Sequence, residues 1–176
     1  MKRLSFFLLL IFSMIHLRAQ NEKYPNRFNL QIGLADRLKL LQYFTYYESY
    51  RISLNYILAP DLSIAVFGGY TPLYEYNTYD QTRYFRGNGF FYGTEVFYYI
   101  NPIALNKKMY TKLYFYLKGR IGGFSAFPIE VPSLSKLDYG IYGGVYYYPF
   151  AKYGVFAELG YGRHSYSQFG FSFRFK

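Results

Sequence analysis

The most constraining feature of the sequence is a period-two alternation of large apolar residues with small or polar ones, which recurs along the chain. Successive side chains of a β-strand point to opposite faces, so this pattern predicts strands with one apolar and one mixed face. The expected strands occupy eight runs: 28–34, 50–58, 62–70, 90–98, 113–121, 141–147, 155–161 and 169–175. Their length suits lipid-spanning strands of about 10 residues.

The composition favours a closed sheet in a membrane. Tyr occurs 25 times, Phe 19 times and Gly 16 times, whereas Trp and Cys are absent and the mean hydropathy is only −0.08. Beyond the N-terminus no run of about 18 apolar residues occurs, so the chain could cross a membrane only as strands, and strands cross only as a closed barrel. The mixed face is poor in charge and rich in Gly and Tyr, which suits a narrow lumen. We predict an all-β, eight-stranded antiparallel up-and-down transmembrane β-barrel; a soluble secreted β-protein is the alternative.

The N-terminus has the order of a secretory signal peptide. Lys2 and Arg3 precede the apolar stretch 6–15, and a polar segment follows Ala19 and Gln20. The apolar stretch is shorter than the roughly 20 residues of a spanning helix, so we predict a cleavable signal over residues 1–20 and a barrel domain over 21–176. Cleavage after Ala19 and cleavage after Gln20 both remain open, and an uncleaved N-terminal anchor is the alternative.

The connections are expected to alternate in length, as periplasmic turns and outer loops do. Segments 59–61, 101–108 and 149–152 are predicted to be short, and segments 35–47, 71–88 and 125–138 to be longer loops. The last connection, at 162–165, is expected to be short, and residues 35–44 could instead form one or two helical turns.

The whole mature chain resembles the small eight-stranded outer-membrane barrels of the OmpX and OmpA type. Its last strand, Phe169–Phe175, has a phenylalanine at every second position. This strand resembles the C-terminal signal that barrel-assembly machinery reads, although Lys176 follows the aromatic on which that signal usually ends. The resemblance implies export to the outer membrane of a Gram-negative bacterium. The expected partners are outer-membrane lipid and lipopolysaccharide, the assembly machinery through Phe169–Phe175, and an envelope protein or a glycan at the outer loops.

Charged residues of both signs share the inward-facing strand parity. They are Arg51, Glu95, Lys118, Arg120, Glu158 and Arg174. Buried charges must be paired, or desolvation costs several kcal/mol each. We therefore expect an ion-pair network across the lumen that closes the barrel, and the alternative is an ion pathway.

Tyrosines crowd the predicted strand ends. A phenol ring prefers a membrane–water boundary, so these residues are expected to form aromatic girdles. The girdle residues would be Tyr98, Tyr99, Tyr110, Tyr147 and Tyr148 at the periplasmic interface and Tyr43, Tyr46, Tyr47, Tyr70, Tyr74 and Tyr161 at the outer one. Alternatively, Tyr74, Tyr76, Tyr79 and Tyr84 form a loop surface that binds glycan or protein.

The sequence predicts no catalytic residues, but a lipid A-modifying enzyme is the alternative function. The run His164-Ser165-Tyr166-Ser167 resembles the H-x-S-N pattern of PagL-type deacylases, although Ser167 stands three residues after His164 and Gln168 stands where that family has Asn. The alternative catalytic set is His164, Ser167 and Glu158. Glu158 lies roughly 20 Å from His164 if the strand runs on, and it points inward, whereas a triad needs hydrogen-bond contact. An acid from another loop, Glu130 or Asp138, would remove that objection.

The remaining function classes find no support in the sequence. His16 leaves with the signal peptide, so His164 has no second histidine for a metal site, and no cofactor motif is present. The formal charge of +10 does not predict nucleic-acid binding, because the chain is exported and has no basic stripe. A structural or interaction role for an outer-membrane barrel is the expected function.

Overall fold

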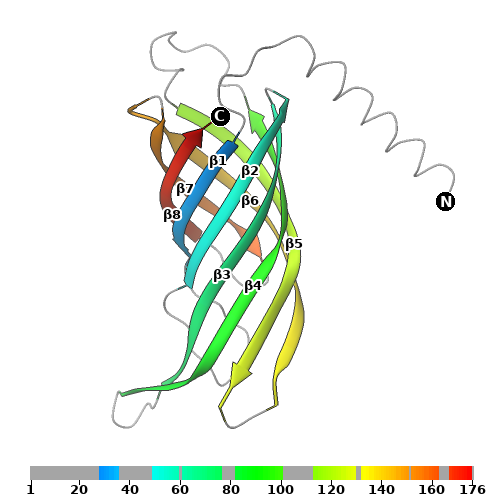
Figure 1. Ribbon diagram of the computed structural model, residues 1–176, viewed down its shortest axis with the longest axis vertical. Helices are drawn as coiled ribbons and strands as arrows, with labels where there is room; N and C mark the ends of the chain where they lie inside the picture. Colours follow the sequence, from blue (N-terminus) through cyan, green and yellow to red (C-terminus); the bar gives the residue numbers. More distant parts are fainter. Residues whose placement is uncertain are drawn as a thin grey trace, which may run out of the picture.

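The strands pair in chain order around a closed ring. The computed structural model describes residues 28–35, 49–59, 61–76, 82–100, 113–129, 132–150, 152–162 and 167–175. The strands are β1 (Phe28–Ala35), β2 (Ser49–Ala59), β3 (Leu62–Tyr76), β4 (Arg83–Ile100), β5 (Leu113–Pro128), β6 (Leu134–Tyr147), β7 (Tyr153–Gly162) and β8 (Ser167–Phe175). Each pairs antiparallel with the next, and β8 pairs back with β1 (Figure 1). The predicted eight-stranded up-and-down barrel is confirmed.

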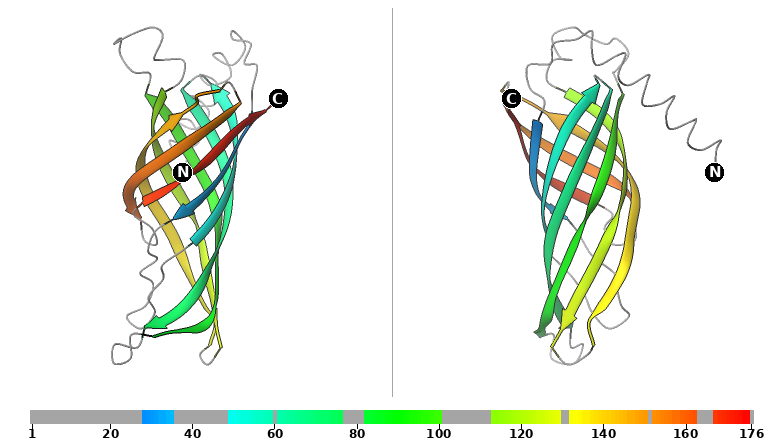
Figure 2. Two further views of the ribbon diagram at one scale, coloured as in Figure 1. Left: turned by 90° about the vertical axis from the view of Figure 1, so that its left-hand side faces the viewer. Right: turned by 45° about the vertical axis from the view of Figure 1, so that its right-hand side comes forward.

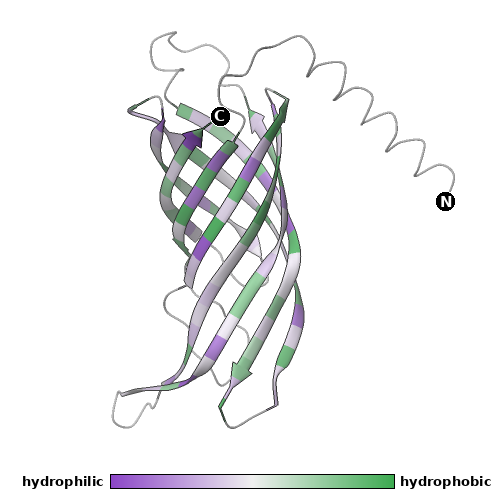
Figure 3. Cartoon of the chain, in the orientation of Figure 1, coloured by the Kyte–Doolittle hydropathy of each residue, from purple (hydrophilic) through white to green (hydrophobic). Residues whose placement is uncertain are grey.

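The two faces of the wall follow the alternation in the sequence. In β2, Arg51, Ser53 and Asn55 are buried, whereas Tyr50 and Ile52 are each 50% exposed. Figure 3 shows hydrophobic and hydrophilic residues alternating along the strands. Large apolar side chains therefore cover the outside of the barrel, and the charged and polar ones lie inside it together with buried aromatic and apolar residues.

The two ends of the barrel differ. We call the end that carries the C-terminus and the turns β2–β3 and β6–β7 the C-terminal rim, and the opposite end, with the hairpins β3–β4 and β5–β6, the distal rim (Figures 1 and 2). These two hairpins extend beyond the strands β1, β2, β7 and β8 at the distal rim. β4 has 18 residues, whereas β1 has 8 and β8 has 9.

The hairpin extensions correct the prediction of long loops at 71–88 and 125–138. Most of these two segments belongs to β3–β6. The strands continue because their inward residues still have partners: Leu73 is fully buried against Phe91 and Phe124. Pro72 interrupts the strand pattern in the sequence, so the extension of β3 could not be predicted. The pairing of β2 with β3 ends at Tyr70, so beyond it β3 is an edge strand on that side within the described ranges. An edge strand tolerates proline, which lacks the backbone N–H.

Glycine allows the wall to bend and pack closely at specific positions. Gly93 of β4 faces Gly122 of β5, and a Cβ atom on Gly93 would lie 2.3 Å from the carbonyl oxygen of Ile121. Gly87 has φ of 143° where the β3–β4 register shifts, a conformation that L side chains rarely adopt. Both positions therefore need glycine.

Several predictions fall outside the described residues. They are the signal peptide at 1–20, nearly all of the loop or helical turn after residue 35, the turn at 101–108, and residues 163–166 with His164. Among the residues that the structure does describe, none forms a helix long and apolar enough to cross a membrane.

Candidate functional site

The interior of the barrel is the candidate site, and its side chains lie in three layers. An aromatic layer lies toward the C-terminal rim and an apolar layer toward the distal rim. The aromatic layer consists of Ala65, Phe97, Tyr99, Tyr116, Tyr146, Tyr148 and Phe156, and the apolar layer of Phe67, Leu73, Phe91, Phe124 and Ala126. Charged residues lie between them, since the Arg51 guanidinium is 5.4 Å from the Phe67 ring and the Lys118 ammonium 5.5 Å from the Phe97 ring.

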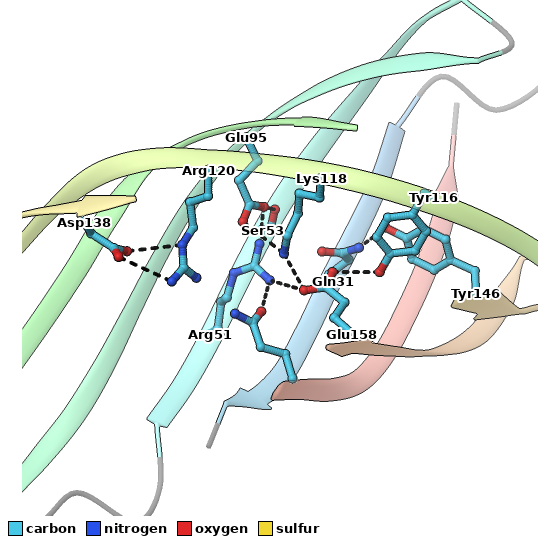
Figure 4. A network of polar contacts seen from close by, with 11 residues as sticks. Gln31, Arg51, Ser53, Glu95, Tyr116, Lys118, Arg120, Asp138, Tyr146 and Glu158 are labelled. Carbon is cyan, nitrogen blue, oxygen red and sulfur yellow. Dashed lines mark hydrogen bonds and ion pairs between the residues drawn. The ribbon is translucent and has the colours of Figure 1, made fainter. Parts of the chain in front are cut away.

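Four charged residues from four strands meet in this middle layer. Arg51 of β2 and Lys118 of β5 both contact the carboxylates of Glu95 in β4 and Glu158 in β7 (Figure 4). The Lys118 Nζ lies 3.2 Å from Glu95 Oε1, and Arg51 Nη1 lies 3.8 Å from Glu158 Oε2. All four side chains are at most 3% exposed. We call this group the lumen network.

Neutral side chains complete the lumen network. The Tyr116 hydroxyl donates a hydrogen bond of 2.7 Å to Glu158, and the Ser53 hydroxyl donates one of 3.3 Å to Glu95. Arg51 also donates to Gln168 of β8. Because each carboxylate accepts from several donors, the desolvation of the buried charges is offset by hydrogen bonds as well as by opposite charge.

The other two charged residues of the predicted network lie beside it. Arg120 faces Asp138 of β6, with Nε 3.2 Å from Oδ2 and Nη2 3.4 Å from Oδ1, a two-point contact. Arg174 lies near the C-terminal rim, with its guanidinium 3.6 Å from the Tyr148 ring centroid and 4.5 Å from that of Tyr114. The six sequence-selected residues thus divide into a group of four, a pair with Asp138, and an arginine between two tyrosines.

Sequence reasoning missed Asp138 and Gln168 as lumen residues. The sequence predicts a loop at 125–138, but Asp138 lies in β6 and is fully buried. Asp138 is four residues before the inward-facing Tyr142, so its side chain points to the same face of the strand. Extending the predicted strand from residue 141 toward the N-terminus would have placed Asp138 inside the barrel. With Asp138 included, the buried charges of the middle layer are three positive and three negative, so this layer is electrically balanced.

The aromatic layer is packed inside the lumen toward the C-terminal rim. Tyr116 and Tyr146 stack with ring centroids 4.5 Å apart. Tyr99 and Tyr148 also point inward and are 8% and 2% exposed, so their assignment to a membrane girdle is wrong. Their inward direction follows from strand parity, because Tyr98 and Tyr147 beside them are the outward residues, exposed by 52% and 45%.

The remaining girdle residues and the tyrosines of the alternative loop surface divide between the barrel surface and the part of the chain that is not described. Tyr161 is outward and 77% exposed, and Tyr84 of the β3–β4 hairpin is 47% exposed. Tyr70 and Tyr74 are partly buried. Residues 43, 46, 47, 79 and 110 lie outside the described ranges, and the side chain of residue 76 is not described.

The alternative catalytic residues do not converge among the described residues. Ser167 pairs with Leu159, which is 71% exposed on the outer face, whereas Glu158 next to it points into the lumen and is fully buried. Ser167 and Glu158 are therefore on opposite sides of the wall. In the described ranges, no group of three or more His, Cys, Asp or Glu residues is arranged to hold a metal ion.

Comparisons with known proteins support the fold. No family model and no curated protein matches the sequence. Among solved structures, the N-terminal β-barrel domain of Pseudomonas aeruginosa OprF superposes with a TM-score of 0.59 at 15% identity, covering 87% of this chain and 100% of that one. Neisserial surface protein A gives 0.54 at 16% identity, covering 85% and 95%. The Yersinia pestis outer membrane protein Ail gives 0.50 at 17% identity, covering 85% and 99%. The chain therefore has the closed eight-stranded barrel fold of small outer-membrane proteins, the fold that its strand pattern predicts.

Proposed function

We propose that the protein is an outer-membrane β-barrel with a sealed lumen, which anchors the chain in the membrane and presents its distal hairpins for interaction outside the cell. The observation that carries this proposal is that the distribution of side chains is the reverse of that in a water-soluble protein. Charged residues are buried inside the barrel, and large apolar residues are exposed on its outer surface. Ile141 and Leu159 are each 71% exposed, whereas Lys118 and Glu158 are 1% exposed. A surface of this kind costs about 25 cal/mol per Å² of apolar area in water and is stable against lipid.

Filling of the lumen supports a structural role over an ion pathway. The lumen network brings charged side chains of four strands into the interior, and the stacked Tyr116 and Tyr146 lie beside it. The positive charges of the network are compensated by its two carboxylates. The test is to reconstitute the purified protein in planar bilayers at low and high salt. We expect no stable single-channel conductance, and stable channels from monomeric protein would refute the sealed lumen.

Strand length supports a projecting surface. At about 3.3 Å per residue and a tilt of about 40°, a strand the length of β4 reaches roughly 45 Å along the axis, whereas the apolar band of such barrels is about 25 Å tall. The β3–β4 and β5–β6 hairpins therefore have residues to spare at the distal rim. With the signal peptide directing export and Phe169–Phe175 read by the assembly machinery, the distal rim would face outward, where an envelope protein or a glycan could bind the exposed Phe85 and Phe127.

The orientation can be tested because the chain has no cysteine of its own. Single-cysteine variants Phe127→Cys, in the β5–β6 hairpin, and Asp61→Cys, in the turn at the C-terminal rim, can be treated in intact cells with a membrane-impermeant maleimide. We expect labelling of Phe127→Cys alone, and labelling of both after the cells are broken. Labelling of Asp61→Cys alone in intact cells would contradict the proposed orientation.

A further inference from the structure

The outer wall contains a groove at a glycine that no packing contact explains. Gly119 of β5 lies on the outward parity, where its neighbours Leu117 and Ile121 are 49% and 57% exposed. A Cβ atom built on Gly119 would have no heavy atom within 4 Å, whereas one on the inward Gly93 would lie 2.3 Å from backbone. Glycine in a strand is unfavourable by about 0.5–1 kcal/mol relative to alanine, and an interior strand glycine often marks close approach of a ligand.

Residues of four strands surround this glycine. Strand pairing places Val96 of β4, Gly119, Ile141 of β6 and Tyr161 of β7 in one row across the wall. The row forms part of an outward groove of about 510 Å³, within the roughly 300–1,000 Å³ of small-molecule sites. Its lining is almost entirely apolar, and Gly119 leaves its floor open.

We propose that this groove holds an acyl chain of an outer-leaflet glycolipid of the lipid A type, with the phenols of Tyr139 and Tyr161 at its headgroup end. This inference rests on the proposed outer-membrane location. The groove is continuous with the apolar belt, since Val96, Ile121 and Ile141 belong to both. Val96 and Gly119 adjoin Glu95 and Lys118 of the lumen network in the middle of the barrel, and Tyr161 lies at the distal end of β7. The groove therefore runs from the middle of the wall toward the distal rim, which the proposed orientation puts in the outer leaflet.

The tyrosines give the groove a direction. Tyr139 and Tyr161 line it and are 50% and 77% exposed, and their rings combine apolar faces with a hydroxyl. Such rings prefer the boundary between acyl chains and headgroups. A methylene chain would therefore run from the tyrosines toward Gly119, where no side chain occupies the space.

Gly119→Leu tests the proposal, and Gly68→Leu is its matched control. Both glycines face outward with no heavy atom within 4 Å of a built Cβ, but only Gly119 lines this groove. Wild type and both variants are purified in a neutral detergent and titrated with hexa-acylated lipid A, and in a second series with palmitoyl-oleoyl-phosphatidylethanolamine. Native mass spectrometry counts the lipids bound to each barrel. Another outward groove lies over β1, β2, β7 and β8 and could also bind lipid. The number of bound lipids is therefore compared between the wild type and each variant.

We expect saturable lipid A binding to weaken about tenfold in Gly119→Leu and to be unchanged in Gly68→Leu, because the leucine side chain would fill the space of the acyl chain, which then loses about ten van der Waals contacts. Equal binding by all three proteins overturns the site. Tighter binding of the phospholipid than of lipid A would refute the assignment of lipid A as the ligand. If the barrel forms dimers that Gly119→Leu abolishes, the groove is instead a contact between two copies of the chain. Heat-dependent gel mobility of each variant reports separately on the membrane barrel, so the site can fail while the proposed function stands.

Discussion

Replacing Glu158 by glutamine should destabilise the barrel strongly. The carboxylate of Glu158 contacts Lys118 and Arg51 and accepts a 2.7 Å hydrogen bond from Tyr116. Glutamine has nearly the same volume, so the substitution removes one negative charge without leaving a cavity. It leaves Arg51 and Lys118 with Glu95 as their shared carboxylate, 3.2 Å from Lys118 Nζ.

The expected magnitude follows from burial. Breaking a buried ion pair by removal of one partner typically costs 3–5 kcal/mol, and because Glu95 still contacts both cations we expect a value of about 3 kcal/mol. The matched control is Glu75→Gln. Glu75 also pairs with an arginine, at 2.7 Å, but the two side chains are 44% and 34% exposed. Exposed pairs contribute at most about 1 kcal/mol, so the control should change little.

The assay is reversible urea unfolding of the protein in short-chain phosphatidylcholine vesicles. The chain has no tryptophan, so the folded fraction is followed by gel mobility without boiling and by far-ultraviolet circular dichroism. The double variant Glu158→Gln with Lys118→Met removes one charge of each sign and should be less destabilised than the sum of the single variants, by about 2 kcal/mol. Equal effects of Glu158→Gln and Glu75→Gln, or strict additivity in the double variant, would refute the reasoning.

Three more outcomes can be checked in the same system. Gly93→Ala should lower the unfolding free energy by about 1–3 kcal/mol because its Cβ would collide with backbone, whereas Gly119→Ala should leave it unchanged or raise it slightly; urea unfolding of the pair decides. Tyr116→Ala combined with Tyr146→Ala should produce brief conductance events in planar bilayers, since two rings that stack inside the lumen are removed, and silent bilayers would show that other layers suffice. Replacing residues 74–86 with a two-residue Asn-Gly turn should keep the heat-dependent gel shift, because the barrel closes without the hairpin tip; loss of the shift would mean that the extension is needed for folding.

The sequence predicted the strands and their sidedness well, because both depend on a local periodicity. The inward position of Arg51, Glu95 and Glu158 follows from parity alone, and so does the outward position of Ile52 and Val96. Strand ends were predicted less well. In β3 and β5 the alternation is interrupted by Pro72 and by consecutive glycines, so the extensions toward the distal rim had no clear signal.

What only the tertiary structure decided is which residues meet. Arg51 contacts Gln168 across 117 positions and Glu95 across 44, and these neighbours depend on closure of β1 against β8 and on the register of every pair between them. Parity puts a charge inside the barrel, but register sets its depth, which is why Arg120 faces Asp138 and Arg174 lies between tyrosines. The groove at Gly119 has the same origin, because its walls come from four strands that are brought together only when the sheet is formed.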